Sequence, residues 1–180
     1  MILPYRNTSP QFGQNVFLAP NATLIGDVRL GDDCSIWFGT VLRGDVNYIQ
    51  IGAKANIQDL CVCHGTLNKW PLIVGAGVTV GHGVILHGCV IQEFCLIGMG
   101  ARILDGARVG PYALVAAGAV VREGFIVPEN TLVAGIPAEV KRELRPDEIE
   151  NLRASAERYH SYKNAYLHAG IGQPMPPHGN

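Results

Sequence analysis

Aliphatic side chains recur every six residues along most of the chain. Leu18, Leu24, Leu30, Ile36 and Leu42 form the first series, and the same spacing runs from Ile91 to Val133. A small residue often follows each aliphatic, and another small or aliphatic residue stands four positions after it. A period of six fits neither an α-helix nor a simple alternating strand, so it predicts a solenoid.

The physical interpretation is an all-β solenoid, a parallel β-helix built from hexapeptide repeats. Each hexad would form one short strand and a turn, three hexads would complete a coil, and coils would stack at ~4.8 Å with the aliphatics inside. We expect this solenoid over residues 1–140, with regular coils from about residue 18.

The pattern changes from about Ala138 onwards. Pro146 and Asp147 predict a helix start and Gly170 its end, so we expect a C-terminal α-helix within 141–170, lying against the solenoid. Its expected packing face comprises Ile149, Leu152, Ala156, Tyr159, Tyr162 and Tyr166. The Pro-rich segment 171–180 is expected to be a disordered tail.

Composition and charge exclude several classes of protein. A net charge of −1 over 180 residues gives no basic surface for nucleic acid. The uncharged stretch Leu72–Ile91 is long enough for a membrane helix, but its five glycines, two histidines and strand-like period argue against one. With no secretory signal at the N-terminus, we expect a soluble, cytoplasmic protein.

The five cysteines are best explained as core residues. Cys63 stands at an inward aliphatic position, and Cys34, Cys61 and Cys95 stand four residues after one. Buried cysteine packs as a small hydrophobe, so structural filling is expected at these four, while the pattern leaves Cys89 open.

Three histidines interrupt the repetitive core. The hexads are broken between Leu42 and Ile51, between Cys63 and Val74, and between Leu86 and Ile91. If the extra residues bulge outward, Leu42, Cys63 and Leu86 begin one face, face A, in successive coils. The residues that follow them, Arg43, His64 and His87, would then form one outward column with the imidazoles roughly 5 Å apart at the backbone. If the second break instead holds two shortened hexads, His64 and His87 fall on different faces.

His82 falls on another face, face C, with Gln58 and Asp59 one coil below it. Three neutral imidazoles with an open fourth position are typical of a catalytic zinc site. His82 reaches the other two only if face C of a neighbouring copy meets face A, and repeating that contact gives a homotrimer. His160, His168 and His178 receive no role.

The segments R-G-D (43–45), N-I-Q-D (56–59), His64 and V-G-H-G-V-I-L-H-G-C (80–89) together resemble the γ-class carbonic anhydrase family, over about Tyr5–Gly170. The hexads resemble those of the hexapeptide-repeat proteins, whose β-helix is left-handed. This resemblance implies a left-handed parallel β-helix and reversible hydration of carbon dioxide to bicarbonate.

The resemblance also implies the roles of individual residues. His64 and His87 of one subunit and His82 of its neighbour would bind zinc, or iron or cobalt, and so supply hydroxide near neutral pH. Gln58 would orient the hydroxide or the bicarbonate. Arg43 would hold bicarbonate or organise the interface with Asp45 and a neighbour's Asp59. Tyr159, in the C-terminal helix, could close the substrate pocket, but packing of the helix against the solenoid explains this residue better.

One departure from the family lowers the expected activity. Acidic residues that pass protons to solvent in well-characterised members are replaced here by Val46 and by Gly65–Asn68. Weak or buffer-dependent hydration is therefore expected. The rival hypotheses are a hexapeptide acyltransferase, a metal-dependent thioesterase, and a binding or assembly subunit in which a metal only stabilises the trimer.

Overall fold

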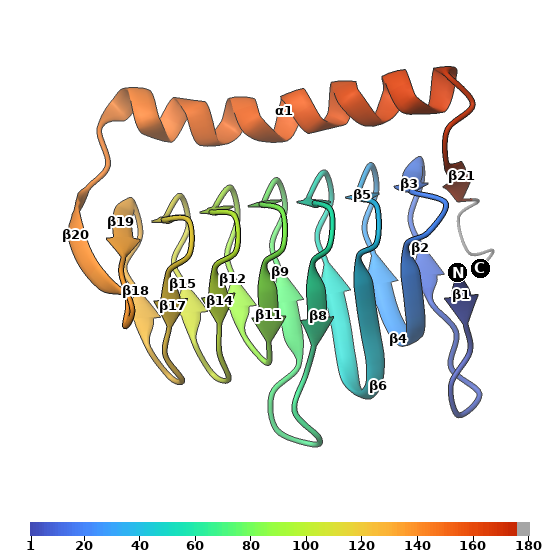
Figure 1. The fold of residues 1–180 in the computed structure, drawn as a ribbon, viewed down its shortest axis with the longest axis horizontal. Coiled ribbons are helices and arrows are strands. Elements are labelled where there is room, and N and C mark those ends of the chain that lie inside the picture. The colour runs from blue at the N-terminus through green and yellow to red at the C-terminus, as the bar shows by residue number, and fades with distance from the viewer. Residues whose placement is uncertain (176–180) are drawn as a thin grey trace.

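Short parallel strands stack into three flat faces, as the six-residue period predicts. The computed structural model describes residues 1–175, which form a left-handed β-helix of about seven turns with a long helix beside it (Figure 1). Face A carries β8 (Val62–His64), β11 (Ile85–His87), β14 (Arg102–Ile103) and β17 (Val120–Val121). Face B carries β9 (Leu72–Val74), β12 (Val90–Ile91), β15 (Arg108–Val109) and β18 (Ile126–Val127), and the longer β4 (Thr23–Leu30) and β6 (Val41–Ile51) span both faces. Face C carries β3 (Val16–Leu18), β5 (Ser35–Ile36), β7 (Asn56–Ile57), β10 (Thr79–Val80), β13 (Leu96–Ile97), β16 (Leu114–Val115) and β19 (Thr131–Ala134).

The interior is a stack of the aliphatic residues that define the repeat. Leu42, Cys63 and Leu86 lie in register on face A, and all three are fully buried. Burying one large aliphatic side chain contributes about 1.5–3 kcal/mol, so the repeat supplies most of the driving force for folding. The residue after an inward position is often Gly because the next coil passes very close: a Cβ on Gly52 would lie 2.6 Å from the Ala76 nitrogen.

Both ends of the face C sheet are covered by antiparallel strands, which the repeat does not predict. β20 (Glu139–Glu143) pairs with β19, and β21 (Gln173–Met175) pairs with β3. The predictions that 141–143 belong to the helical segment and that 173–175 belong to a disordered tail are therefore wrong. The physical reason is that an open sheet end leaves backbone N–H and C=O groups unpaired. Residues 176–180 of the predicted tail, including His178, lie outside the described residues.

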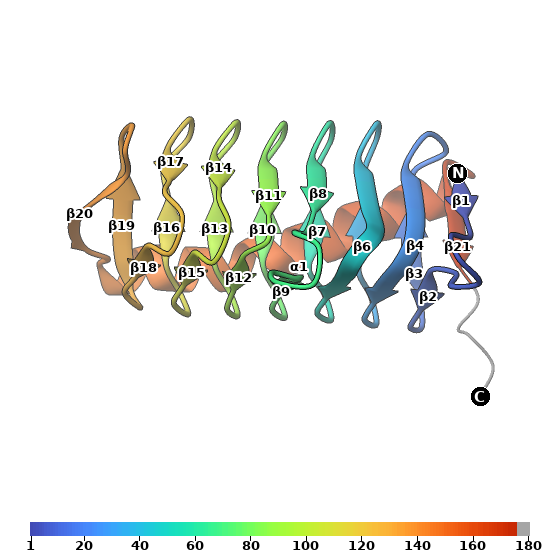
Figure 2. The same cartoon turned by 90° about the horizontal axis from the view of Figure 1, so that it is seen from below.

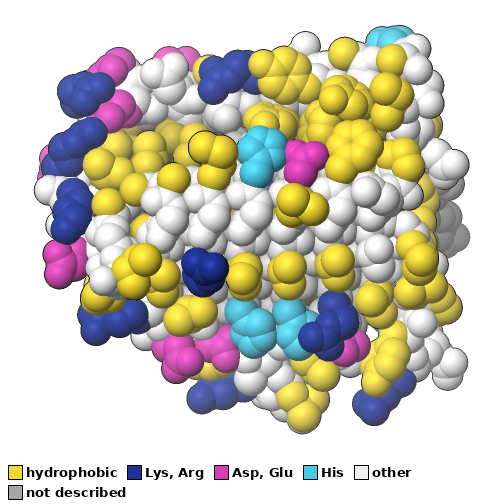
Figure 3. Space-filling model, in the orientation of Figure 1, with side chains coloured by type: hydrophobic (Ala, Val, Ile, Leu, Met, Phe, Trp, Pro, Cys, Tyr) yellow, Lys and Arg dark blue, Asp and Glu magenta, His cyan; other side chains and the backbone are white. Residues whose placement is uncertain are grey.

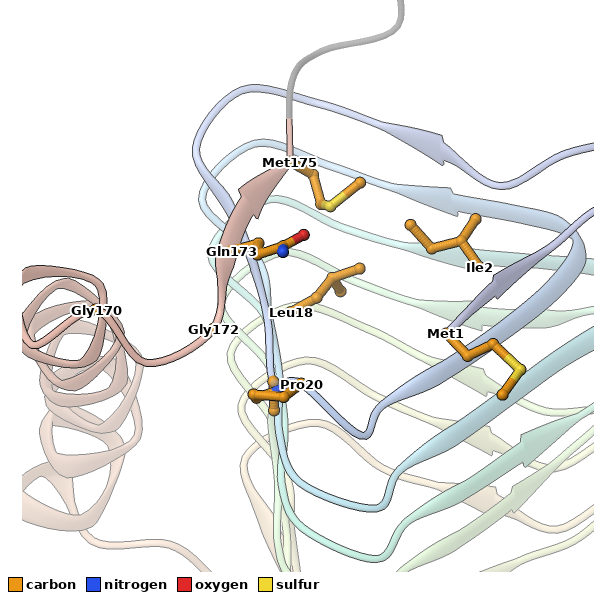
Figure 4. Close-up of a pocket in the computed structure, with 9 residues that line it drawn as sticks. Met1, Ile2, Leu18, Pro20, Gly170, Gly172, Gln173 and Met175 are labelled. Carbon is orange, nitrogen blue, oxygen red and sulfur yellow. The ribbon is translucent and has the colours of Figure 1, made fainter.

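The coils also begin earlier than residue 18. β1 (Ile2–Leu3) and β2 (Gln11–Phe12) both pair in parallel with β4 and extend the solenoid towards the N-terminus. A cavity of about 440 Å³ lies at this end, between β1 and the segment that leaves the helix (Figure 4). Its lining includes Leu18, Pro20 and Met175, and none of the described lining residues has an acidic, basic, hydroxyl or thiol side chain.

Helix α1 (Pro146–His168) runs along the solenoid and contacts β5, β7 and β10 of face C (Figures 1 and 2). It begins at Pro146 and is followed by Gly170 in a left-handed conformation, as predicted. Its buried residues are Leu152, Ser155, Ala156 and Lys163. No helix within residues 1–175 combines the length and the apolar character needed to cross a bilayer.

One residue of the predicted helix face lies elsewhere. Tyr162 is 50 % exposed, whereas Lys163 is buried at the neighbouring position. The apolar pattern placed Tyr162 rather than Lys163 on the buried face because Lys163 has polar partners, the Asn15 carbonyl and the Asp33 carboxylate, that make its burial possible. Tyr162 only touches the edge of the Tyr159 ring, at a centroid distance of 5.5 Å.

Candidate metal centre

Arg43, His64 and His87 form one column on the outside of face A. The strand register pairs Arg43 with His64 and His64 with His87 in successive coils. Each follows a buried inward residue, so strand alternation turns its side chain outward. The structure thus adopts the first of the two register choices left open by the sequence, with the segment after His64 forming a loop that projects from the coil (Figure 1).

The two imidazoles of this column face each other through one nitrogen each. His64 Nδ1 lies 3.1 Å from His87 Nε2. Two ligands of a tetrahedral zinc ion, at 2.0–2.1 Å each, are separated by about 3.3–3.4 Å. The spacing of the two nitrogens is therefore close to that of two imidazoles sharing one cation.

The outer nitrogens of both imidazoles are held by carboxylates. Asp45 Oδ1 lies 2.9 Å from His64 Nε2, and Asp105 Oδ1 lies 2.6 Å from His87 Nδ1. The pKa of Asp45 is lowered: burial raises it, but hydrogen bonds from His64 and Arg43 and the charge of Arg43 outweigh burial. The pKa of Asp105 is lowered as well, because hydrogen bonds from Thr66 and His87 and nearby positive charge outweigh burial.

This arrangement favours one tautomer of each imidazole. An ionised carboxylate only accepts hydrogen bonds, so each outer nitrogen donates its proton outward. In the neutral rings both inner nitrogens then present lone pairs to each other across 3.1 Å. Such a pair is satisfied by a cation between the rings, and the donor set fits a metal that prefers imidazole. Figure 3 shows histidines side by side with acidic and basic side chains on this surface.

Arg43 supports the column through Asp45. Its Nη1 donates to Asp45 Oδ2 at 2.5 Å, while the other oxygen of the carboxylate accepts from His64. The Arg43 side chain is 46 % exposed, so part of the guanidinium remains available to an anion or to another chain.

His82 lies on face C, apart from the His64–His87 pair. Its Nδ1 is 2.8 Å from Asp59 Oδ2, the residue one coil below, and the imidazole is 50 % exposed. Within residues 1–175 of a single chain, no three His, Cys, Asp or Glu side chains come together as a metal-binding group. Asp59 holds Nδ1 of His82, just as Asp45 and Asp105 each hold one ring nitrogen of His64 and His87.

A groove of about 370 Å³ adjoins His82 on face C. Gln58 lines it and is almost fully buried, with its Nε2 donating to Asn56 Oδ1 at 3.2 Å. Tyr159 of α1 also lines it, packs edge-on against Trp37, and has its pKa raised by burial and by the charge of Asp59. Most of the remaining lining is apolar, including Leu96, Met99 and Leu114.

The cysteines take no part in this centre. All five are buried and unpaired, including Cys89, which the sequence pattern left open. Burial raises the pKa of Cys34, Cys61 and Cys95 to about 12. Thiols of this kind are poor metal ligands at neutral pH because the ligating form is the thiolate.

Asp105 and Thr66 are members of the site that the sequence analysis missed. Thr66 Oγ1 donates to Asp105 Oδ2 at 2.5 Å, and the other oxygen of Asp105 contacts His87. The signal was present in the repeat: Asp105 follows the inward Ile103 by two residues, as Asp59 follows Ile57. Applying the register one coil further would have placed a carboxylate beside His87.

Comparisons with known proteins agree on the fold, but the matched proteins carry the names of two different activities. The family model described as "Bacterial transferase hexapeptide (six repeats)" matches residues 9–44 and 88–123. A Geobacillus kaustophilus protein named carbonic anhydrase is 46 % identical over 88 % of this chain and 87 % of its own length. Protein YrdA of Escherichia coli is 43 % identical over 94 % of this chain and 96 % of its own length.

The solved structures carry a different functional name. A Bacillus cereus protein described as a candidate acetyltransferase superposes with a TM-score of 0.91 at 43 % identity, covering 94 % of this chain and 98 % of its own. One curated relative is thus named for carbonic anhydrase activity and one structural neighbour for acetyl transfer, while the name of protein YrdA states no activity.

Proposed function

Since the chain belongs to the γ-class carbonic anhydrase-like family of hexapeptide-repeat proteins, we propose that it is a metal-dependent enzyme that hydrates carbon dioxide to bicarbonate. The observation that carries this proposal is the His64–His87 pair, whose facing nitrogens lie 3.1 Å apart while carboxylates hold the outer ones. Zinc fits this donor set, and iron or cobalt would fit it as well. When bound, such a cation acidifies a water molecule to a pKa of roughly 7, which provides a nucleophile at neutral pH.

The third imidazole comes from a second copy of the chain in this proposal. His82 is exposed, its outer nitrogen is held by Asp59, and it lies on a different face from the pair. Face C of one subunit against face A of the next, repeated around a threefold axis, gives a homotrimer with three equivalent sites.

The remaining residues bind and orient the substrate. In this proposal the amide of Gln58 orients the hydroxide or the bicarbonate; its hydrogen bond to Asn56 and its place in the groove lining support that role. Nη1 of Arg43 donates to Asp45, and the guanidinium is partly exposed. In this proposal its other N–H groups bind bicarbonate, or contact Asp59 of a neighbouring subunit at the interface. Asp45 holds His64 in the tautomer that a metal requires.

Proton removal is the weak step of this proposal. Val46 and Gly65–Asn68 offer no carboxylate, and both oxygens of Asp105 are already engaged, by Thr66 and His87. Buffer molecules must then carry the proton to solvent, so hydration is slow at low buffer concentration.

Acyl transfer is the second candidate, with metal-assisted thioester hydrolysis as a variant of it. The groove beside His82 is larger and more apolar than a three-atom substrate requires, and the Bacillus cereus neighbour carries an acetyltransferase description. An assembly subunit in which the metal only stabilises the trimer is the non-enzymatic alternative.

The test measures metal content and activity on the same sample. Anaerobically purified protein is analysed by mass spectrometry for metals and by stopped-flow carbon dioxide hydration at two buffer concentrations. We expect about one metal per chain, hydration that rises with buffer, and loss of both in His87→Ala. His168→Ala, an exposed histidine in the last turn of α1, is the matched control.

The other outcomes separate the alternatives. A metal-free preparation that transfers acyl groups would replace the proposal with the acyltransferase. Metal with no hydration, together with trimer dissociation on chelation, would favour the assembly subunit. Fast hydration independent of buffer would contradict the proton-removal argument alone.

A further inference from the structure

Asp105 and Thr66 form a hydrogen-bonded chain that ends on His87. Thr66 Oγ1 donates to one carboxylate oxygen of Asp105, and the other oxygen lies 2.6 Å from His87 Nδ1. The three residues come from different places: the loop after β8, the corner after β14, and the end of β11. Thr66 and Asp105 are 39 residues apart in sequence, so only the coiling brings them together.

The loop that carries Thr66 is itself fixed over this corner. The backbone nitrogen of Thr66 donates to the carbonyl of Trp70, and the amide of Asn47 donates to the carbonyl of Thr66. The Trp70 side chain lies against Gly88 and Gly106: a Cβ on Gly88 would be 2.8 Å from the Trp70 Cβ and 2.4 Å from Asp105 Oδ1. Gly88 has a φ of +53°, so the corner needs glycine both for its backbone and for the space beside Asp105.

We propose that Asp105, oriented by Thr66, is a positioning residue that fixes the tautomer and ring orientation of His87. The inference rests on the proposed function, because its purpose is to present the lone pair of His87 Nε2 towards His64. A carboxylate at Nδ1 only accepts, so the imidazole proton stays on Nδ1 and Nε2 stays free. Partners of this kind behind a ligating histidine typically change metal affinity about 10–100-fold.

Asp105→Asn tests the inference because it keeps the shape but adds a donor. If Thr66 keeps donating to the side-chain oxygen of Asn, the amide NH₂ faces His87 and donates to Nδ1. The proton of His87 then moves to Nε2, the nitrogen that faces His64. Thr66→Val leaves the carboxylate in place but removes its anchor, so a smaller effect in the same direction is expected.

Three readouts are needed, and one of them uses no metal. Zinc affinity is measured by competition with a chromophoric chelator, and cobalt-loaded protein is compared by visible absorption. In metal-free protein, long-range ¹H–¹⁵N correlation spectra report which ring nitrogen of His87 carries the proton. Glu123→Gln is the matched control, because Glu123 stands at the same position of the next coil, two residues after the inward Val121.

The expected result is a 10–100-fold loss of zinc affinity and a change of the His87 tautomer in Asp105→Asn, with Glu123→Gln unchanged. Zinc affinity within twofold of the parent, together with an unchanged tautomer, would overturn the inference while leaving the proposed function standing. If the parent chain binds no metal, the proposed function fails, and the tautomer of His87 alone decides whether Asp105 positions it.

Discussion

Lys163 is a buried cation that fixes helix α1 to the first coils, and replacing it should destabilise the protein. Its Nζ donates to the Asn15 carbonyl at 2.7 Å and to Asp33 Oδ1 at 2.9 Å, and its side chain is 1 % exposed. Lys163→Met keeps most of the aliphatic packing and removes both hydrogen bonds. The experiment therefore isolates the polar contribution of one side chain.

The expected change in the free energy of unfolding follows from the two hydrogen bonds that are lost and from the exposure of Asp33. Hydrogen bonds to a charged group contribute about 1.5–3 kcal/mol each, and breaking a buried pair typically costs about 3–5 kcal/mol. Asp33 is 26 % exposed, so water replaces part of the lost interaction. We expect a loss of about 2–4 kcal/mol in the free energy of unfolding.

The effect should also depend on pH. Burial raises the pKa of Asp33, but the hydrogen bond and charge of Lys163 and the charges of His160 and Lys54 lower it overall. A lowered folded pKa contributes stability above the unfolded value of about 3.9, and this contribution is lost as the pH falls through the folded pKa. The difference between Lys163→Met and the parent chain should therefore be larger at pH 7 than at pH 3.

Urea denaturation at equal protein concentration measures these free energies. Lys54→Met is the matched control: Lys54 also pairs with α1, through Glu157 at 3.0 Å, but both side chains are largely exposed. An exposed pair contributes about 0–1 kcal/mol. A double-mutant cycle with Asp33→Asn gives the coupling energy. If Lys163→Met costs no more than Lys54→Met, the reasoning is refuted.

Two further predictions concern the core. All five cysteines are buried, and burial raises the pKa of Cys34, Cys61 and Cys95 to about 12. A chromogenic disulfide reagent at pH 8 should therefore modify almost no thiol in the native protein and five per chain in urea. Fast labelling of the native protein would contradict the burial. Leu86→Ala, beneath the histidine column, should cost about 2–5 kcal/mol by leaving a cavity, whereas Leu67→Ala in the exposed loop should change the unfolding free energy little. Equal effects of the two substitutions would contradict the assigned register.

Several features of the fold follow from the sequence because they are local or strictly periodic. The six-residue recurrence determines which residues point inward. Counting through the irregular segments leaves two registers, of which the structure adopts the one that brings His64 beside His87. The start of α1 follows from Pro146, whose missing N–H is tolerated only in the first helical turn. The position of Asp59 one coil below His82 follows from the same count, whereas their contact is seen in the structure.

Other features depend on contacts between distant parts of the chain, which no local pattern records. β20 and β21 cover the two ends of the face C sheet, where the repeat has ended. They pair with backbone N–H and C=O groups that would otherwise be unpaired. The burial of Lys163 in place of Tyr162 depends on Asp33, a partner 130 residues away. The apolar pattern of α1 alone therefore places the wrong neighbour on the buried face.

For the candidate metal centre as well, some features follow from the sequence and others only from the tertiary structure. The sequence by itself identified the candidate histidines, because they are the main polar side chains in an uncharged part of the repeat, and it left two registers for their column. The structure adopts the register in which His64 and His87 lie side by side. Only the tertiary structure determined which nitrogen each imidazole presents, because that depends on Asp45 and Asp105 approaching from neighbouring coils. The repeat can place a carboxylate near an imidazole, but the nitrogen that it contacts depends on side-chain rotamers, which are decided by the packing of the folded chain.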